Sequence, residues 1–319
     1  MPDIPHGGRL IAAQRQYPNA PEPWIDLSTG INPHAYPFTP PPPEAWTRLP
    51  EPEQVTALEA IAAQAYGAPH CAIDPAMVVA APGSQALIQL LPKLFPQPTI
   101  AIPGPTYAEH EAAWRAAGTI IDPASPAKIL CNPNNPDGTR HNPATLQAQT
   151  LLIIDEAFAD FDPTLSLIPQ MPRPDTIILR SLGKAYGLPG LRLGFAIAPP
   201  KEAAQIRTAL GPWAISGPAI AIGAQALADT AWRNTAAARA QASAKSLDTL
   251  LSRNGFQTIG GTTLFRTAAH PEAPAIAQHL AQSAILVRTF PTHPTWLRLG
   301  LPPNAPAWTR LTTALFHPR

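Results

Sequence analysis

Short apolar runs rich in Val and Ile recur through the first two thirds of the chain, each bounded by Gly, Pro, Asn or Asp. Runs of this length and composition predict buried β-strands. We expect seven strands, over residues 77–81, 99–102, 119–121, 127–131, 151–155, 176–180 and 193–198. Longer segments with helical spacing of apolar residues lie between them, as at 84–95 and 107–117. This alternation predicts an α/β fold with a mostly parallel seven-stranded sheet flanked by helices.

The pattern changes after Pro199, where an alanine-rich helical region at about 218–253 precedes short strands and helices. A chain of 319 residues is long enough for one large domain and a smaller companion. We therefore expect a large domain over 30–228 and a smaller α/β domain formed by 1–29 and 229–319. The proline run at 40–43 is expected in a linker or a surface loop.

Composition and charge exclude several classes of protein. With 45% hydrophobic and 13% charged residues the chain is not disordered, and a net charge of +1 predicts neither nucleic acid nor a membrane as partner. Cys71, Cys131 and the nine histidines show no metal-ligand spacing, so we expect no metal. The paucity of cysteine, and the lack of a secretory signal at 1–10, predict a cytoplasmic protein.

Specific polar residues follow five of the predicted strands. Ligands of an open parallel sheet bind beyond the carboxyl ends of its strands, so these are candidate site residues. In chain order they are Gly83, Ser84 and Gln85, then Tyr107, Asn135 and Asp155, and finally Ser181 and Lys184. We expect all of them at one edge of the sheet.

The order and spacing of these residues resemble a known family. Lys184 follows Ser181 by three residues and Asp155 by 29, and Arg192 comes eight residues later. Asn135 precedes Asp155 by 20 residues. The pattern is similar, over nearly the full chain, to the fold-type-I pyridoxal phosphate enzymes of the class I/II aminotransferase family. The resemblance implies the transferase fold type I and pyridoxal 5′-phosphate as cofactor.

Two catalytic residues follow from this resemblance. Lys184 would form the Schiff base with the cofactor aldehyde, and Asp155 would keep the pyridine nitrogen protonated. A carboxylate that follows the apolar run 151–154 is costly to bury without a cation, which argues against a simple cap.

The remaining cofactor contacts are also implied by the resemblance. Gly83, Ser84 and Gln85 at a helix start, with Ser181 and Arg192, would bind the cofactor phosphate. Tyr107 would stack on the ring and Asn135 would contact its O3′ atom. Plain structural alternatives are a helix cap at 83–85, a core aromatic at Tyr107 and an ordinary turn at Asn135.

Two positions depart from the family pattern. Many relatives carry a tyrosine three residues after the aspartate, where this chain has Phe158. Many also carry a Tyr-Pro-Asp segment that reaches the neighbouring subunit, where this chain has Leu49, Pro50 and Glu51. Both changes put individual cofactor contacts in question, though not the cofactor.

Substrate residues are suggested by segments at both ends of the chain. Three segments are similar to L-threonine O-3-phosphate decarboxylases of cobalamin biosynthesis, namely residues 6–8, 26–33 and 155–161. Two further segments are similar to histidinol-phosphate aminotransferases, namely residues 285–288 and 296–300. This resemblance implies that Arg298 binds the substrate carboxylate. The substrate phosphate would be held by Arg288, His6 and Asn32, with Asn135 also near the substrate. The structural alternatives are exposed strand ends for both arginines and a flexible terminus for His6.

The resemblance predicts a homodimeric decarboxylase of a phosphorylated amino acid, with L-threonine O-3-phosphate as the expected substrate. An aminotransferase of the histidinol-phosphate type is the first alternative. A catalytically silent cofactor-binding regulator is the second. Such a regulator usually carries a DNA-binding module, and we expect none in the stretch before the first predicted strand at Met77.

Overall fold

The computed structural model describes residues 6–67 and 71–316, which form two compact units. Among the described residues, the large unit holds 35–135 and 140–235, and the small unit holds 6–34, 136–139 and 236–316. The predicted domain limits fall close to these unit limits, and the domain division itself stays a prediction. The two ends of the predicted small domain, residues 1–5 and 317–319, lie outside the described residues.

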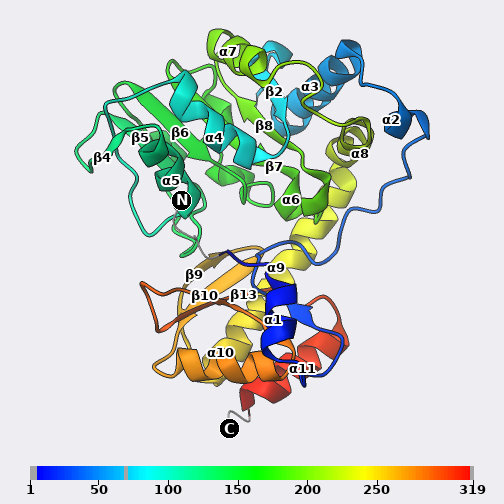
Figure 1. The fold of residues 1–319 in the computed structure, drawn as a ribbon, viewed down its shortest axis with the longest axis vertical. Coiled ribbons are helices and arrows are strands. Elements are labelled where there is room, and N and C mark those ends of the chain that lie inside the picture. The colour runs from blue at the N-terminus through cyan, green and yellow to red at the C-terminus, as the bar shows by residue number, and fades with distance from the viewer. Residues whose placement is uncertain (1–5, 68–70, 317–319) are drawn as a thin grey trace. The chain divides into compact units, whose positions relative to one another are not determined.

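The large unit is built on a central sheet (Figure 1). Five strands pair in the order β2 (Val78–Ala81), β8 (Gly194–Ile197), β7 (Thr176–Ser181), β6 (Leu151–Asp155), β5 (Ala127–Cys131). A parallel bridge between Ala101 and Lys128 continues the sheet into the pair β3 (Thr99–Ile100) and β4 (Ile120–Ile121). Only β8 runs antiparallel to its neighbours. The predicted α/β fold with a mostly parallel sheet is confirmed.

Helices cover both faces of this sheet. On one face α4 (Ser84–Leu94), α5 (Ala108–Ala116) and α7 (Pro200–Leu210) bury apolar residues against the strands, among them Leu91, Trp114 and Ile206. On the other face the Tyr66 ring of α3 (Pro52–Gly67) meets Phe195 of β8 edge-on. The strands are therefore buried on both sides, which explains their unbroken apolar sequences.

The predicted helical region at 218–253 consists of two helices, α8 (Gly217–Ala228) and α9 (Thr230–Arg253). The break lies at Asp229, whose carboxylate accepts a hydrogen bond of 2.8 Å from the Trp232 amide. This contact is an N-cap, so Asp229 ends one helix and begins the next. The proline run at 40–43 lies, as predicted, in a mostly exposed loop before α2 (Glu44–Thr47).

The small unit draws on both ends of the chain. Its antiparallel sheet has the order β12 (Arg288–Thr289), β13 (Trp296–Gly300), β10 (Phe265–Ala269), β9 (Gln257–Thr262). A parallel pair joins β1 (Ile25–Asp26) to β11 (Ile285–Leu286). Its helices are α1 (Leu10–Gln16), α10 (Ala273–Gln282) and α11 (Ala305–Phe316), together with the part of α9 from residue 236 on.

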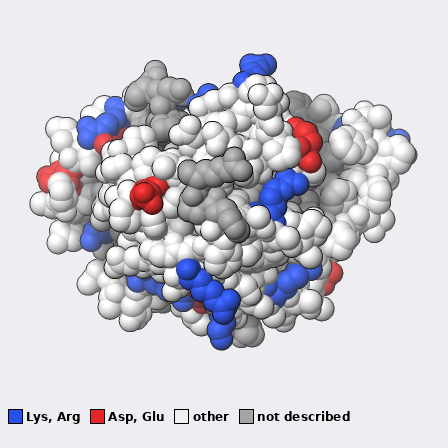
Figure 2. All heavy atoms as spheres, turned by 90° about the horizontal axis from the view of Figure 1, so that it is seen from below, with Lys and Arg blue, Asp and Glu red and all other residues white. Residues whose placement is uncertain are grey.

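The surface agrees with the low content of charged residues. On the face drawn in Figure 2, charged side chains of both signs are scattered over a mostly uncharged surface. Within residues 6–67 and 71–316, no helix has the length and apolar character needed to cross a membrane.

Candidate active site

A cavity at the carboxyl ends of the parallel strands gathers the residues predicted from the sequence. All nine predicted cofactor-binding residues line it, namely Gly83, Ser84, Gln85, Tyr107, Asn135, Asp155, Ser181, Lys184 and Arg192. Its wall is completed by residues that include Cys131 and Phe158. Residues spread over more than a hundred positions therefore meet in one place, because all but Arg192 follow or end a strand at the same sheet edge, and Arg192 precedes the antiparallel strand β8 there.

One end of the cavity is suited to an anion. Helix α4 begins there, with Gly83 as its N-cap at a φ of 81°. A Cβ on Gly83 would lie 2.7 Å from a guanidinium nitrogen of Arg192, and a Cβ on Gly194 would lie 2.5 Å from the Ser84 amide. The two glycines thus allow the helix start and Arg192 to pack closely. Free amides of a helix N-terminus beside a guanidinium favour a phosphate.

Ser181 shapes the turn that carries Lys184. Its hydroxyl oxygen accepts a hydrogen bond of 3.3 Å from the Gly183 amide and caps the short helix α6 (Leu182–Ala185). The ammonium of Lys184 lies 5.5 Å from the ring centroid of Phe158. Phe158 stands at the position where many relatives have a tyrosine. It therefore offers Lys184 an aromatic face without a hydroxyl group.

Asp155 forms a buried pair with a histidine that the sequence analysis missed. The His110 Nε2 atom lies 3.0 Å from Asp155 Oδ2, and Asp155 Oδ1 accepts a hydrogen bond from the Ala157 amide. Burial alone would lower the pKa of His110, but hydrogen bonds to Asp155 and Cys131 raise it to about 10. A protonated His110 is the cation that makes a buried Asp155 carboxylate tolerable.

A sequence signal for His110 exists. It follows Tyr107 by three residues at the start of α5, so the two side chains lie on one helix face. Their rings meet edge-on, with centroids 6.0 Å apart. Among the described residues, His110, Cys131 and Asp155 also form one group whose ligand atoms could hold a metal ion. The direct bond between His110 and Asp155 accounts for two of these three side chains, and the expected absence of a metal stays a prediction.

Tyr107 and the asparagine-rich loop are held by further polar contacts. The Tyr107 hydroxyl donates to Gln85 Oε1 at 3.0 Å, and burial raises the pKa of Tyr107. Beside Asn135, the Asn134 amide donates to the Pro105 carbonyl at 2.8 Å and accepts from the Thr106 hydroxyl at 2.7 Å. The ring of Tyr107 and the loop that carries Asn135 are therefore held in place by named hydrogen bonds.

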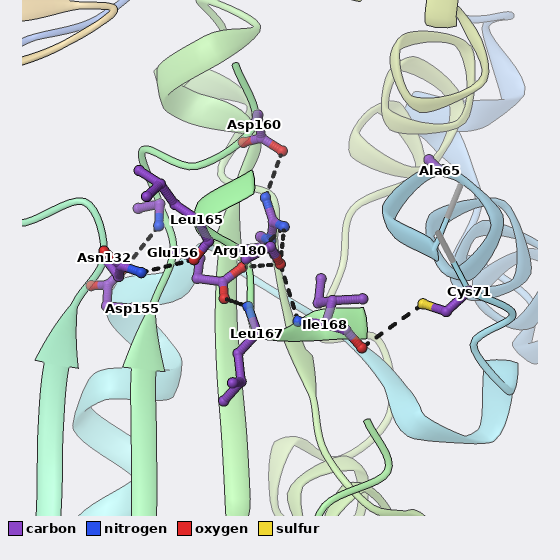
Figure 3. Close-up of polar contacts among 12 residues, drawn as sticks. Ala65, Cys71, Asn132, Asp155, Glu156, Asp160, Leu165, Leu167, Ile168 and Arg180 are labelled. Carbon is purple, nitrogen blue, oxygen red and sulfur yellow. Dashed lines mark hydrogen bonds and ion pairs between the residues drawn. The ribbon is translucent and has the colours of Figure 1, made fainter. Parts of the chain in front are cut away.

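Arg180 lies in a buried charge cluster with Glu156 and Asp160 (Figure 3). The guanidinium of Arg180 contacts Glu156 at 3.0 Å and Asp160 at 3.3 Å, and all three side chains are almost fully buried. Glu156 also accepts hydrogen bonds of 2.7 Å from the Ser166 hydroxyl and the Leu167 amide. Burial raises the pKa of Glu156 and of Asp160, and Arg180 opposes both shifts.

This cluster adjoins the site along the chain. Glu156 follows Asp155, and Arg180 precedes Ser181. The ion pairs therefore tie the segment just after β6 to β7, at positions next in sequence to Asp155 and Ser181.

Four predicted substrate residues lie in the small unit, whereas Asn135 lies in the large one. Arg298 is 5% exposed, so the alternative of an exposed strand end is wrong for it. Its guanidinium donates to the Ser28 carbonyl at 2.6 Å and lies 5.1 Å from the Phe265 ring centroid. Burial and the neighbouring charge of Arg288 lower the pKa of Arg298 to about 10, against the opposing influence of Asp26.

The other predicted substrate residues of the small unit differ in burial. Arg288 is half-buried and directly opposite Arg298 in the strand pair β12–β13. Asn32 is buried, and its side-chain oxygen accepts from the His34 amide at 3.0 Å. His6 is exposed, and the adjoining Gly8 amide donates to the Ser28 hydroxyl at 2.8 Å. Ser28 thus contacts both Gly8 near the N-terminus and Arg298.

Comparison with known proteins identifies the class. The chain matches the family model of class I and II aminotransferases over residues 24–128 and 121–310, and it belongs to this family. It is 39% identical to threonine-phosphate decarboxylase of Pseudomonas aeruginosa over 98% of this chain and 97% of that protein. It is 40% identical, with the same two shares, to threonine-phosphate decarboxylase of a Sinorhizobium species.

A solved structure supports the fold. The histidinol-phosphate aminotransferase of Sinorhizobium meliloti in complex with pyridoxal 5′-phosphate matches with a TM-score of 0.82 at 19% identity, over 98% of this chain and 94% of that one. Together with the family match, this likeness confirms the predicted transferase fold type I.

Proposed function

We propose that this protein decarboxylates L-threonine O-3-phosphate with pyridoxal 5′-phosphate as cofactor. The products are (R)-1-aminopropan-2-yl phosphate, the amino alcohol unit of the corrinoid side chain, and carbon dioxide. The observation that carries the proposal is the buried Arg298 facing Arg288 across one strand pair. Two neighbouring positive charges suit a substrate with two anionic groups, a carboxylate and a phosphate.

The residues of the cavity fit the cofactor. The close packing at Gly83 and Gly194 leaves the helix start and Arg192 facing one small space, as a phosphate requires. Asp155 supplies a carboxylate for the pyridine nitrogen, and Asn135 an amide for the O3′ atom. Lys184 supplies the amine that holds the aldehyde carbon. When bound, the cofactor would withdraw electrons from one bond at the substrate Cα and so assist the cleavage of that bond.

The protein decides which bond that is by orienting the substrate. Arg298 and Arg288 offer charge-assisted hydrogen bonds to the carboxylate and the phosphate, and His6 and Asn32 add polar contacts to the phosphate. With the phosphate anchored, Arg298 and Arg288 would fix the direction of the bond between Cα and the carboxylate carbon. Loss of carbon dioxide from that bond, with a proton taken up by Cα in its place, would give the proposed products.

A phosphate anchor also sets specificity. Binding energy from the phosphate, remote from the reacting bond, is used to position that bond. Threonine without its phosphate is therefore expected to be a very poor substrate.

The decisive experiment uses threonine phosphate labelled at the carboxylate carbon. Stoichiometric release of labelled carbon dioxide, without any keto-acid acceptor, supports the decarboxylase. Retention of the label with acceptor-dependent transfer of the amino group would instead establish the aminotransferase alternative. If the cofactor-loaded protein catalysed neither reaction, the result would support the alternative of a catalytically silent regulator.

We also propose a homodimer in the cytoplasm. Trp46, Leu49 and Trp213 line one surface groove of the large unit and are 68%, 65% and 60% exposed, an apolar area suited to a second copy. Leu49→Glu should convert the dimer to a monomer in light scattering, and a wild-type protein that is monomeric would contradict the proposal. The cytoplasmic location is supported by the absence of a disulfide between Cys71 and Cys131.

A further inference from the structure

A short piece of the Asn135 loop belongs to the small unit. Residues 136–139 group with the small unit, although the chain on both sides of them belongs to the large unit. Within this piece the Asp137 side chain accepts from the Thr139 amide at 3.0 Å and from the Thr139 hydroxyl at 2.8 Å. The piece is thus a compact turn, held by its own hydrogen bonds.

Glycines allow this turn to lie directly on strand β9. A Cβ on Gly138, whose φ is 72°, would lie 2.1 Å from the Gly261 amide nitrogen. A Cβ on Gly260 would lie 2.1 Å from the Asp137 carbonyl oxygen. Backbone meets backbone here, and a side chain at either position would force the turn away from the strand.

A buried threonine fastens the turn to the sheet. The Thr267 side chain is fully buried in β10, and its hydroxyl donates a short hydrogen bond to the Pro136 carbonyl. The pairing of β9 with β10 shifts register between Thr267 and Ala268. Irregularities of this kind re-aim side chains near functional sites.

The chain between this bond and Asn135 is stiff. Pro136 has its φ fixed by the pyrrolidine ring, and a residue that precedes proline is restricted to extended conformations. Fixing the Pro136 carbonyl therefore leaves the backbone of Asn135 little freedom. Thr267 itself is not among the residues that line the cavity.

We propose that Thr267 is a positioning residue that holds Asn135 in place for the cofactor O3′ atom. The inference rests on the proposed role of Asn135 as a donor to that atom, though not on the reaction catalysed. Thr267 is also the strand partner of Arg298 in the β10–β13 pair. One ladder of the small unit therefore carries both the proposed carboxylate-binding arginine and the anchor of the Asn135 loop.

The test is a pH titration of the visible absorbance of the cofactor-loaded protein without substrate. The titration follows loss of the proton that the cofactor O3′ oxygen shares with the neighbouring imine nitrogen. A hydrogen-bond donor to O3′ stabilises the deprotonated form, so loss of the donor moves the midpoint to higher pH. For Asn135→Ala we expect a rise of roughly one pH unit. Thr267→Val should move the midpoint in the same direction by part of that amount, and Thr267→Ser, which keeps the hydroxyl, should restore it.

The double variant distinguishes positioning from a general effect. If Thr267 acts through Asn135, the variant with both Thr267→Val and Asn135→Ala has the midpoint of Asn135→Ala alone. Gly260→Ala, which displaces the turn by a different route, should also raise the midpoint. Thr258→Val on the exposed side of β9 is the matched control, with a wild-type midpoint expected.

Three results would overturn the inference. They are a wild-type midpoint in Thr267→Val, shifts that add in the double variant, and a wild-type midpoint in Asn135→Ala itself. Each leaves the release of labelled carbon dioxide from threonine phosphate untouched, so failure of this inference is separable from failure of the proposed function.

Discussion

Arg180 in the large unit and Arg298 in the small unit are both almost fully buried, but their electrostatic surroundings differ. Arg180 forms ion pairs with Glu156 and Asp160. Burial would lower the pKa of Arg180, but these carboxylates raise it above its ordinary value. For Arg298, burial and the like charge of Arg288 act in the same direction and lower the pKa.

The difference separates two uses of a buried arginine. The charge of Arg180 is compensated within the fold and ties two strands together. The charge of Arg298 is held close to a second positive charge, an arrangement that an anionic ligand relieves. The large unit therefore carries a buried arginine that is paired with carboxylates, and the small unit carries a buried arginine that lies beside a second arginine.

The largest expected effect concerns the stability of variants at these two arginines. Arg180→Met leaves two buried carboxylates without their cation and should lower the free energy of unfolding by about 3–5 kcal/mol. Arg298→Met, which mainly removes the donor to Ser28, should cost about 1 kcal/mol. Urea unfolding of both variants checks this. Equal losses would remove the distinction between the two arginines.

Within the large unit, Asp155→Asn should impair catalysis far more than folding. The substitution removes the negative charge proposed to keep the pyridine nitrogen protonated, a contact worth about 1.5–3 kcal/mol, or roughly 10- to 150-fold in turnover. Carbon dioxide release from threonine phosphate and the thermal melting temperature are measured on the same preparation. Turnover at the wild-type rate would rule out the proposed role of Asp155.

In the small unit, Arg288→Ala should act on the substrate and spare the cofactor. Loss of one charge-assisted contact to the substrate phosphate is expected to raise the KM for threonine phosphate roughly 10-fold or more. The Kd of the cofactor, followed by its visible absorbance, should stay unchanged because Arg288 lies outside the cofactor cavity. A KM unchanged by the substitution would remove Arg288 from the proposed phosphate site.

The last prediction is a pH dependence of stability that belongs to the large unit. The pKa of His110 is raised from its ordinary 6.5 to about 10, so the folded protein retains a proton that the unfolded chain releases. The stabilisation is complete below about pH 6.5 and is lost as the pH rises through 10. The melting temperature of wild type should fall across this range more steeply than that of His110→Asn. Parallel profiles would contradict the raised pKa.

The set of residues that line the cavity was largely predictable from the sequence. Gly83, Asp155 and Lys184 each end or follow a strand, and the carboxyl ends of parallel strands share one edge of a sheet. Arg192 was predicted from the family resemblance alone. Once the strands were read from their apolar runs, the cavity followed from their order. His110 was missed because a single histidine inside an amphipathic helix carries no spacing signal apart from its distance to Tyr107.

The charge states and the anchoring contacts were not predictable. The pairing of Arg180 with Glu156 and Asp160 depends on which atoms meet in three dimensions. The same holds for Thr267, whose bond to Pro136 joins residues 131 positions apart. No local pattern encodes a contact of that kind.

The sequence by itself determined the strands, the α/β class and the identity of the residues around the cavity, because apolar periodicity and the spacing of polar residues after strands are local properties. The tertiary structure alone decided which of two buried arginines is balanced by carboxylates and which lies beside another arginine. It also decided that a turn of the Asn135 loop packs on Gly260 and Gly261. Burial and Coulomb interactions depend on distances in space, and these are set only when the chain is packed.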